Sequence, residues 1–272
     1  MSRSALQRVV KGAAVAADLV RPPHRGVVVL LYHRVGRRTE SEVDLPVDLF
    51  DAQLDALTAT GRVAPLDACL DALASPGPPG TTDPIAITFD DGTADFVDIA
   101  MPRLERHGLP VTLYVATAFV EESRTFPGDG TPASWAALRD AQSTGLVTVG
   151  SHTHGHALLD RLPAVDVEHQ LDRSRELIEQ RLGTVPAHFA YPKAVAGSAV
   201  ADAAVRARFR SAALAGTRAN PYGHTDPYRL ARSPIQRADG MSWFRRKLEG
   251  GMGLEDRLRT LANRRRYAGA TT

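Results

Sequence analysis

Two adjacent carboxylates, Asp90 and Asp91, follow an apolar segment at the point where it meets Gly92. The apolar run at residues 85–89 predicts a buried strand, which would deliver both acids to the rim of a sheet. Like charges on neighbouring residues repel unless a cation or a proton holds them, so we consider Asp91 as a metal ligand and Asp90 as a general base. The alternative is a solvated acidic turn, because Asp and Gly are common turn residues.

Three histidines, His152, His154 and His156, follow another short apolar segment at residues 146–149. A helical or turn-like winding would place His152 and His156 on one side, where both could bind one ion, whereas we assign His154 no metal role. With Asp91 they supply two nitrogens and one carboxylate oxygen, which leaves coordination positions open for water and substrate. A polar loop with incidental histidines and an iron oxygenase site are the alternatives, the second disfavoured by the strand and helix alternation described below.

The elements that would position these residues alternate between strands and helices. Strands are predicted at residues 27–32, 85–89, 110–116, 146–149, 188–191 and 211–214, and helices at 46–59, 67–74, 95–107, 132–145, 163–182 and 200–209. Alternation without a sequence repeat favours a parallel β/α architecture, and a barrel of seven or eight strands fits the count. Catalytic residues of such barrels lie at the C-terminal ends of strands, where His33, Asp90 and the histidine cluster fall.

Composition predicts one domain. The 272 residues are 43% hydrophobic and 24% charged, which is ordinary for a globular protein with a core. The lone cysteine, Cys69, excludes an intrachain disulfide framework and is expected to be inert packing. We divide the chain into a basic N-terminal leader helix (1–25), a catalytic domain (26–240) and a basic C-terminal helical tail (241–272).

Charge is concentrated at the two ends. Residues 1–25 carry a net charge of +4 and residues 241–272 a net charge of +5, so the body between them is net −7. Basic ends could touch an anionic membrane surface or nucleic acid, although short basic termini are more often solvated. We expect no nucleic-acid partner and at most a weak peripheral membrane contact through the tail. Without a convincing signal peptide or membrane-spanning segment, a cytoplasmic location is predicted.

The segment Thr88-Phe89-Asp90-Asp91-Gly92, followed by Ser151-His152-Thr153 and then His156, resembles the polysaccharide deacetylase family, the NodB-homology carbohydrate esterases. The resemblance spans about residues 27–236. It implies a distorted (β/α) barrel and metal-assisted hydrolysis of an N-acetyl or O-acetyl group on a sugar, so the expected partner is an N-acetylated sugar or glycan. By the same resemblance Asp90 is the general base. Asp91, His152 and His156 bind the metal, with Zn²⁺ expected first and Co²⁺, Ni²⁺ or Fe²⁺ as alternatives.

The third family motif, which normally reads Arg-Pro-Pro-Tyr-Gly, departs from the pattern. The chain has Ala190-Tyr191-Pro192-Lys193-Ala194, so the arginine that orients the base is missing, and this puts the tuning of Asp90 in doubt. The backbone N–H of Lys193 could still stabilise the oxyanion, since a backbone donor tolerates side-chain change. We expect Tyr191 and Pro192 to contact the substrate.

The late Leu-His motif that usually supplies the general acid is also missing. Arg232 stands in the expected place, and we expect it to bind substrate. The segment Tyr32-His33-Arg34-Val35 resembles the branch that acts on poly-N-acetylglucosamine, in which the histidine after the first strand serves as the acid. His33 is therefore our candidate general acid, the alternative being a histidine that only hydrogen-bonds a neighbouring loop. The two missing motifs also leave open a catalytically weak or silent carbohydrate-binding protein.

Overall fold

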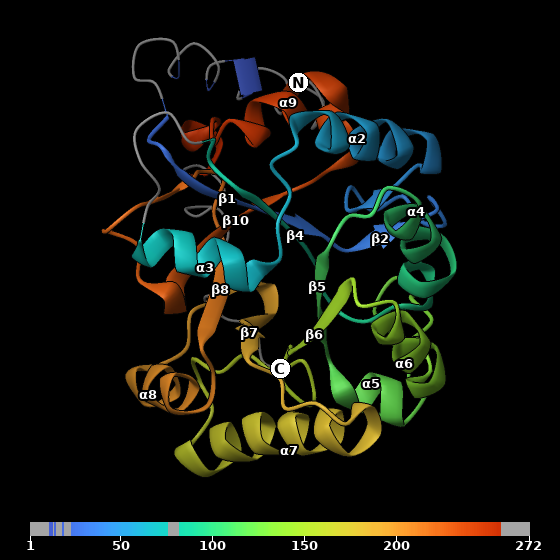
Figure 1. Ribbon diagram of the computed structural model, residues 1–272. Helices are drawn as coiled ribbons and strands as arrows, with labels where there is room; N and C mark the ends of the chain where they lie inside the picture. Colours follow the sequence, from blue (N-terminus) through green and yellow to red (C-terminus); the bar gives the residue numbers. More distant parts are fainter. Residues whose placement is uncertain (1–10, 13, 15–17, 19–22, 76–81, 257–272) are drawn as a thin grey trace, which may run out of the picture.

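The computed structural model describes residues 11–12, 14, 18, 23–75 and 82–256, and in it seven parallel strands close into a barrel (Figure 1). In order around the ring they are β1 (Gly26–Tyr32), β4 (Ile85–Phe89), β5 (Val111–Val115), β6 (Val147–Ser151), β7 (His188–Ala190), β8 (Ser211–Ala215) and β10 (Leu230–Pro234). The pairing of β10 with β1 closes the ring, with Leu30 opposite Ser233. The predicted single-domain β/α barrel is confirmed.

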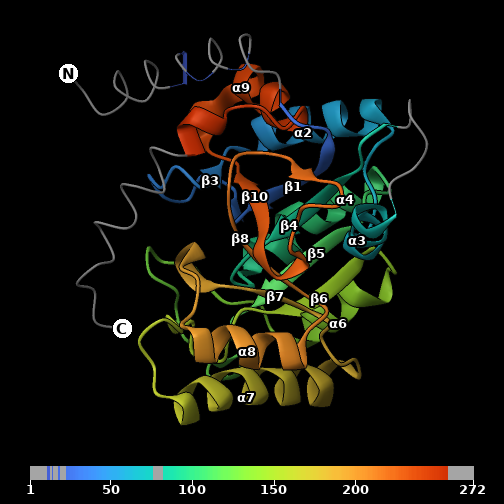
Figure 2. The same cartoon turned by 90° about the vertical axis from the view of Figure 1, so that its left-hand side faces the viewer.

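Helices surround this ring. They are α2 (Val47–Thr60), α3 (Leu66–Ala74), α4 (Met101–Arg106), α5 (Thr117–Glu121), α6 (Trp135–Ser143), α7 (Ala164–Leu182), α8 (Ala199–Arg208) and α9 (Gly240–Leu248). Helix α7 ends where Gly183 adopts a left-handed φ of 72°, and α8 begins where the Ser198 side chain accepts a hydrogen bond from Ala201 N. Figure 2 shows α7 and α8 packed side by side at the end of the molecule far from α9.

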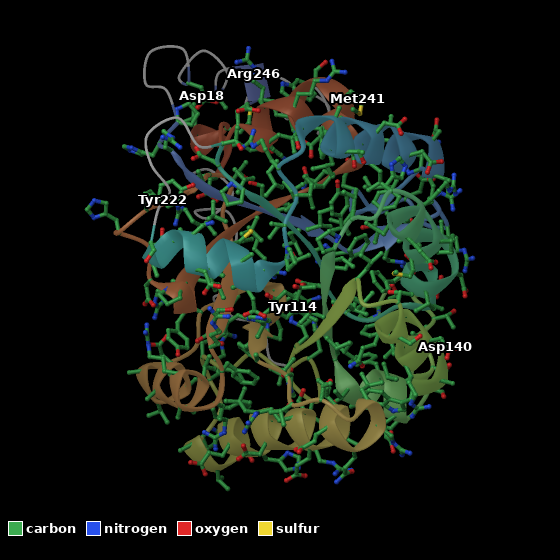
Figure 3. All side chains as sticks on the ribbon, viewed as in Figure 1. Asp18, Tyr114, Asp140, Tyr222, Met241 and Arg246 are labelled. Carbon is green, nitrogen blue, oxygen red and sulfur yellow. The ribbon has the colours of Figure 1, made fainter. Side chains whose placement is uncertain are left out.

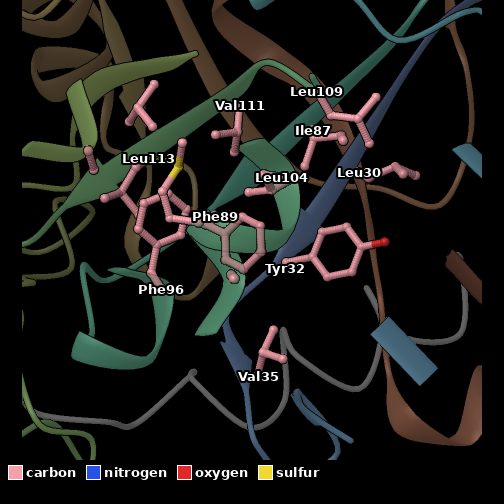
Figure 4. Close-up of a cluster of buried hydrophobic side chains, with 14 of the residues drawn as sticks. Leu30, Tyr32, Val35, Ile87, Phe89, Phe96, Leu104, Leu109, Val111 and Leu113 are labelled. Carbon is pink, nitrogen blue, oxygen red and sulfur yellow. The ribbon is translucent and has the colours of Figure 1, made fainter. Parts of the chain in front are cut away.

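The main core lies between the strands and the outer helices. On β4 the side chains of Ile85, Ile87 and Phe89 point outward into this core, together with Leu30 and Tyr32 of β1 (Figure 4). The Tyr32 and Phe89 rings stack with centroids 5.1 Å apart. Because side chains alternate along a strand, the intervening residues and the residue that follows Phe89 face the barrel interior.

Helix α3 closes the N-terminal end of the barrel. Its buried residues Leu66, Cys69, Leu70 and Leu73 belong to one cluster with inward-facing side chains of the strands, which include Val27, Val29, Ala86, Ala213 and Leu230. Burial raises the pKa of the Cys69 thiol to about 12, which agrees with the predicted packing role.

Several elements were not predicted, among them the short paired strands β2 (Arg34–Val35) and β3 (Asp44–Leu45). Strand β10 carries Arg232 and Pro234 in five residues, so it lacks the apolar pattern of a barrel strand. The short strand β9 (Asn220–Pro221) pairs antiparallel with β1, and α5 is only five residues long. The segment expected as a helix at 95–107 begins with a π-helical turn (Phe96–Ala100) before α4.

The ends of the chain contact the domain through a buried ion cluster. Asp239, beyond the end of β10, pairs with Lys11 through one oxygen and with Lys247 Nζ through the other at 2.8 Å. Two basic side chains of the terminal segments are therefore buried rather than solvated, contrary to expectation. Most of the leader and residues 257–272 of the tail lie outside the described residues. Among the helices that are described, none has the length and apolar character needed to cross a bilayer.

Candidate active site

The alternation of side chains along the strands brings the predicted residues to one end of the barrel. His33 follows β1, Asp90 follows β4 and His152 follows β6, all with the parity that faces inward. Backbone hydrogen bonds continue the pairing of neighbouring strands past the strand ends. Asp90 N donates to Tyr32 O at 3.1 Å, and His152 N donates to Val115 O at 2.9 Å. Gly92 is required at the turn after the acids, since its φ is 90° and an added Cβ would lie 3.2 Å from Val115 Cγ1.

Asp91, His152 and His156 form the predicted metal-ligand set. Their candidate donor atoms all lie within 4.8 Å of one another, with Asp91 Oδ1 3.7 Å from His152 Nε2 and 3.5 Å from His156 Nε2. These distances exceed a hydrogen bond and suit three donors that face a common point. His154 is not in this set, and its Nδ1 lies 3.0 Å from Thr117 Oγ1.

The protonation states of the two imidazoles also fit a metal. His152 Nδ1 lies 2.8 Å from Ala190 O, and because a carbonyl only accepts, Nδ1 carries the proton and Nε2 keeps its lone pair facing Asp91. Burial lowers the pKa of His152 despite the opposing charges of Asp90 and Asp91. Burial, with repulsion from His152, lowers the pKa of His156 to about 3. Both rings are therefore neutral near pH 7, as metal binding requires.

Asp90 has the arginine partner that the third motif lacks. Arg232 of β10 is 0% exposed, and its Nη1 and Nη2 donate to the two carboxylate oxygens of Asp90 at 2.5 and 2.8 Å. Burial alone would raise the pKa of Asp90, but the Arg232 charge and hydrogen bonds, with His152, lower it to about 2. The expectation that the base lacks a steadying arginine is therefore wrong, since the arginine comes from another strand.

His33 and Lys193 lie at the same end of the barrel. His33 is close enough for its charge to lower the pKa of Asp90, and its Nδ1 is buried without a hydrogen-bond partner among the described residues. Lys193 is exposed, and its charge contributes to the lowered pKa of His156. Both residues therefore lie beside the acids and imidazoles, as the sequence predicted, and their catalytic roles stay predictions.

Three residues expected to contact the substrate are buried. The Tyr191 ring is 1% exposed within the cluster beneath α8, its hydroxyl lies 3.4 Å from Asp202 Oδ1, and Pro192 is buried as well. Substrate contact by Tyr191 or Pro192 would therefore have to come from the backbone. The guanidinium of Arg232 is buried against Asp90, so it has no accessible group with which to bind substrate as expected.

Backbone strain is concentrated in the loops that form the site. Asp91, Thr153, His156, Lys193 and Ala194 have φ values of 78°, 65°, 59°, 54° and 55°. Positive φ is unfavourable for residues with a side chain, and most of all for a β-branched residue such as Thr153. Strain of this kind persists where surrounding structure imposes it, and it is typical of functional loops.

Sequence reasoning missed two contributors to the site. No local signal pointed to the Arg232 pairing, because the segment that carries Arg232 lacks the apolar pattern of a barrel strand. Helix α5 places Phe119 against His156, with ring centroids 6.3 Å apart, and Phe119 in turn stacks on Phe126 at 4.2 Å. An aromatic pair therefore lies beside the second histidine.

Comparison with solved structures gives the same fold. The Streptococcus pyogenes deacetylase PplD in complex with acetate is 19% identical, with a TM-score of 0.70 over 83% of this chain and 98% of that one. IcaB from Ammonifex degensii is 24% identical, with a TM-score of 0.70 over 82% and 98%. A de-N-acetylase from Aggregatibacter actinomycetemcomitans is 19% identical, with a TM-score of 0.66 over 81% and 99%. At these identities the likeness establishes the fold alone.

Comparison with protein families goes further. A search among curated proteins gave no match. The family model described as polysaccharide deacetylase matches residues 77–212, half of the 272 residues. The matched part contains Asp90, Asp91, His152 and His156, and it ends before Arg232. The chain therefore belongs to the polysaccharide deacetylase family and is a carbohydrate deacetylase.

Proposed function

We propose that the chain is a metal-dependent hydrolase that removes acetyl groups, N-acetyl groups first, from a carbohydrate. One observation carries the proposal. The carboxylate of Asp90 is held by Arg232, and its Oδ2 lies 3.8 Å from Nε2 of His152, a candidate metal ligand. An ionised acid beside a set of open metal ligands suits a general base, whereas a carbohydrate-binding protein has no need of one.

The three candidate ligands, Asp91, His152 and His156, would hold the metal. Two imidazole nitrogens and one carboxylate oxygen suit Zn²⁺ and also accept Co²⁺, Ni²⁺ or Fe²⁺. When bound, such an ion lowers the pKa of water and polarises a carbonyl group.

The protein's own groups supply the proton transfers. Asp90 accepts a proton from the water that attacks the acetyl carbon, and Arg232 keeps the carboxylate ionised and oriented for that step. The carbon–nitrogen bond then breaks, and His33 donates a proton to the departing nitrogen, so that the products are acetate and a free amine. The Lys193 N–H would donate to the former carbonyl oxygen as negative charge develops on it.

Acetate release tests this proposal. The purified chain, supplied with Zn²⁺ or Co²⁺, is offered a panel of N-acetylated and O-acetylated sugars and oligosaccharides, and Asp90→Asn is compared with it. We expect the wild type to release acetate and Asp90→Asn to be slower by about 10²- to 10⁴-fold, the usual contribution of a general base. Asp98→Asn is the matched control, because it is the same chemical change at an exposed aspartate eight positions away.

Two outcomes would contradict the proposal. If wild type and Asp90→Asn are equally inactive over the whole panel, the hydrolytic function fails. If the chain binds a glycan of the panel without releasing acetate, the carbohydrate-binding alternative is favoured.

We also propose that residues 1–25 and 241–272 flank the catalytic domain (26–240), and that the tail makes a weak peripheral contact with an anionic membrane surface on the cytoplasmic side. Support comes from the +5 charge of the tail and from Arg245 and Arg246, which are exposed on α9. Sedimentation with phosphatidylserine vesicles, compared with phosphatidylcholine vesicles, should carry down the wild type and less of the double variant Arg245→Glu, Arg246→Glu. Equal sedimentation of the two proteins would end this proposal.

A further inference from the structure

An aromatic ring lies against the guanidinium that holds Asp90. Cζ of Arg232 lies over the ring of Tyr114 on β5, 5.1 Å from the ring centroid. Both side chains are 0% exposed. Figure 3 places Tyr114 among the barrel strands. The carboxylate, the guanidinium and the ring therefore form a buried group of three inside the barrel, in which the guanidinium contacts both of the others.

The neighbouring strand provides room for this ring through a glycine. Gly150 of β6 is the cross-strand partner of Tyr114. A Cβ added at Gly150 would lie 2.7 Å from Tyr114 Cδ1 and 2.9 Å from Tyr114 Cε1. The same Cβ would lie 2.9 Å from the backbone oxygen of His188, so a side chain at this position would collide with both the ring and the next strand, and the ring fits where it is because residue 150 is glycine.

The face of the ring, and not its hydroxyl, provides the contact. The Tyr114 hydroxyl is buried without a hydrogen-bond partner among the described residues, so it does not anchor the side chain. The ring belongs instead to the interior cluster that contains Leu66, Cys69 and Leu70 of α3, which closes the barrel beneath it. Packing therefore fixes the ring, and the ring presents its face to the cation.

We propose that Tyr114 is a positioning residue for deacetylation, which holds the plane of the Arg232 guanidinium so that it bonds both oxygens of Asp90. A cation over an aromatic face is attracted by the ring quadrupole, and more strongly where water is excluded. The other hydrogen bonds of the guanidinium are longer than its 2.5 and 2.8 Å bonds to Asp90. Nε lies 3.2 Å from Leu214 O, and Nη1 lies 3.3 Å from Thr88 Oγ1. The effect on rate rests on the proposed function, whereas the support of Arg232 by the ring does not.

Kinetics of single and double variants test the effect on rate. Tyr114→Phe keeps the ring and should leave kcat within about twofold of the wild type, whereas Tyr114→Leu should lower kcat about tenfold with little change in KM. In an Arg232→Met background, Tyr114→Leu should have no further effect on kcat, because the group through which the ring acts is gone. Equal effects in both backgrounds, or a Tyr114→Phe as slow as Tyr114→Leu, would overturn the proposal.

Urea unfolding of the same variants tests the contact without activity. The effect of Tyr114→Leu on the unfolding equilibrium constant should be about tenfold larger with Arg232 present than with Met at that position. Tyr222→Leu, at a half-buried tyrosine on the N-terminal side of the barrel, is the matched control and should combine additively with Arg232→Met. An inactive wild type would contradict the proposed function. If the effects of Tyr114→Leu and Arg232→Met on the free energy of unfolding are additive, the inference about Tyr114 is wrong.

Discussion

Replacing Arg232 by methionine should leave a buried carboxylate without its partner. The substitution keeps much of the side-chain length but removes the charge and both hydrogen bonds to Asp90, 2.5 and 2.8 Å long. Asp90 is 3% exposed, so water does not replace the lost partner. We therefore expect Arg232→Met to fold less stably, to lose catalytic rate, and to change its dependence on pH.

The size of the effect follows from the pKa of Asp90. The lowering from 3.8 to about 2 corresponds to about 2 kcal/mol of stability near neutral pH. Without Arg232 the burial of Asp90, the largest influence on its pKa, is opposed by His152 and His33 but no longer by the arginine, so the pKa of Asp90 rises. Breaking one partner of a buried ion pair costs about 3–5 kcal/mol in general, and we expect a loss in that range at pH 7.

The sign of the pH dependence separates this account from simple loss of packing. In the wild type the lowered pKa of Asp90 stabilises the fold above pH 3.8, and this contribution disappears as the pH falls toward 2. In Arg232→Met the raised pKa reverses the direction, so protonation of Asp90 relieves the penalty as the pH falls. The difference in the free energy of unfolding between the wild type and Arg232→Met should therefore become smaller as the pH falls from 7 to 4.

Urea unfolding at a series of pH values, with kcat/KM measured over the same range, checks this prediction. The acid limb of the kcat/KM profile should move to higher pH in Arg232→Met, because Asp90 then takes up its proton more readily. Arg232→Lys keeps the charge but not the paired hydrogen bonds, so its stability and its acid limb should lie between those of the wild type and of Arg232→Met. If the difference in stability between the wild type and Arg232→Met stays constant with pH and the acid limb does not move, Arg232 does not hold down the pKa of Asp90.

Three further predictions concern the metal ligands, the base and the acid. Asp90→Asn should still bind one metal ion per chain while losing acetate release, and loss of the metal would show that Asp90 is a ligand instead of a base. His156→Ala should lower metal affinity by at least about tenfold, as measured by competition with a chromogenic chelator, whereas His154→Ala should bind as the wild type does. His33→Asn should slow hydrolysis of an N-acetyl sugar by about 10²-fold or more but affect 4-nitrophenyl acetate little, because that leaving group needs no proton. Equal slowing on both substrates would contradict the general-acid role.

The strand pattern predicted most of the fold. Long apolar segments such as residues 27–32 and 85–89 were recognisable because a barrel strand is buried on both faces. The same segments end at His33 and Asp90, so their shared location at one end of the barrel followed from parallel topology. The metal-ligand candidates Asp91, His152 and His156 were predicted in the same way, and the structure brings their donor atoms together.

What the sequence left out depended on contacts between distant strands. Arg232 lies 142 positions from Asp90, and β10 has too few apolar residues to be recognised as the strand that closes the barrel. Strand parity alone could not show that the arginine beside Asp90 comes from β10 rather than from the third motif after β7. Tyr114 was predicted only as part of an apolar strand, since its position beside Gly150 depends on the register of β5 with β6.

We expect deacetylation by this chain to depend on a metal ion held by Asp91, His152 and His156. The direct measurement is acetate release from an N-acetylated substrate by chelator-treated protein as Zn²⁺ is added back in known amounts. We predict no release before the addition, a rise that levels off near one ion per chain, and no such rise in His156→Ala at the same concentrations. Full activity of the wild type after the metal has been removed would contradict the account.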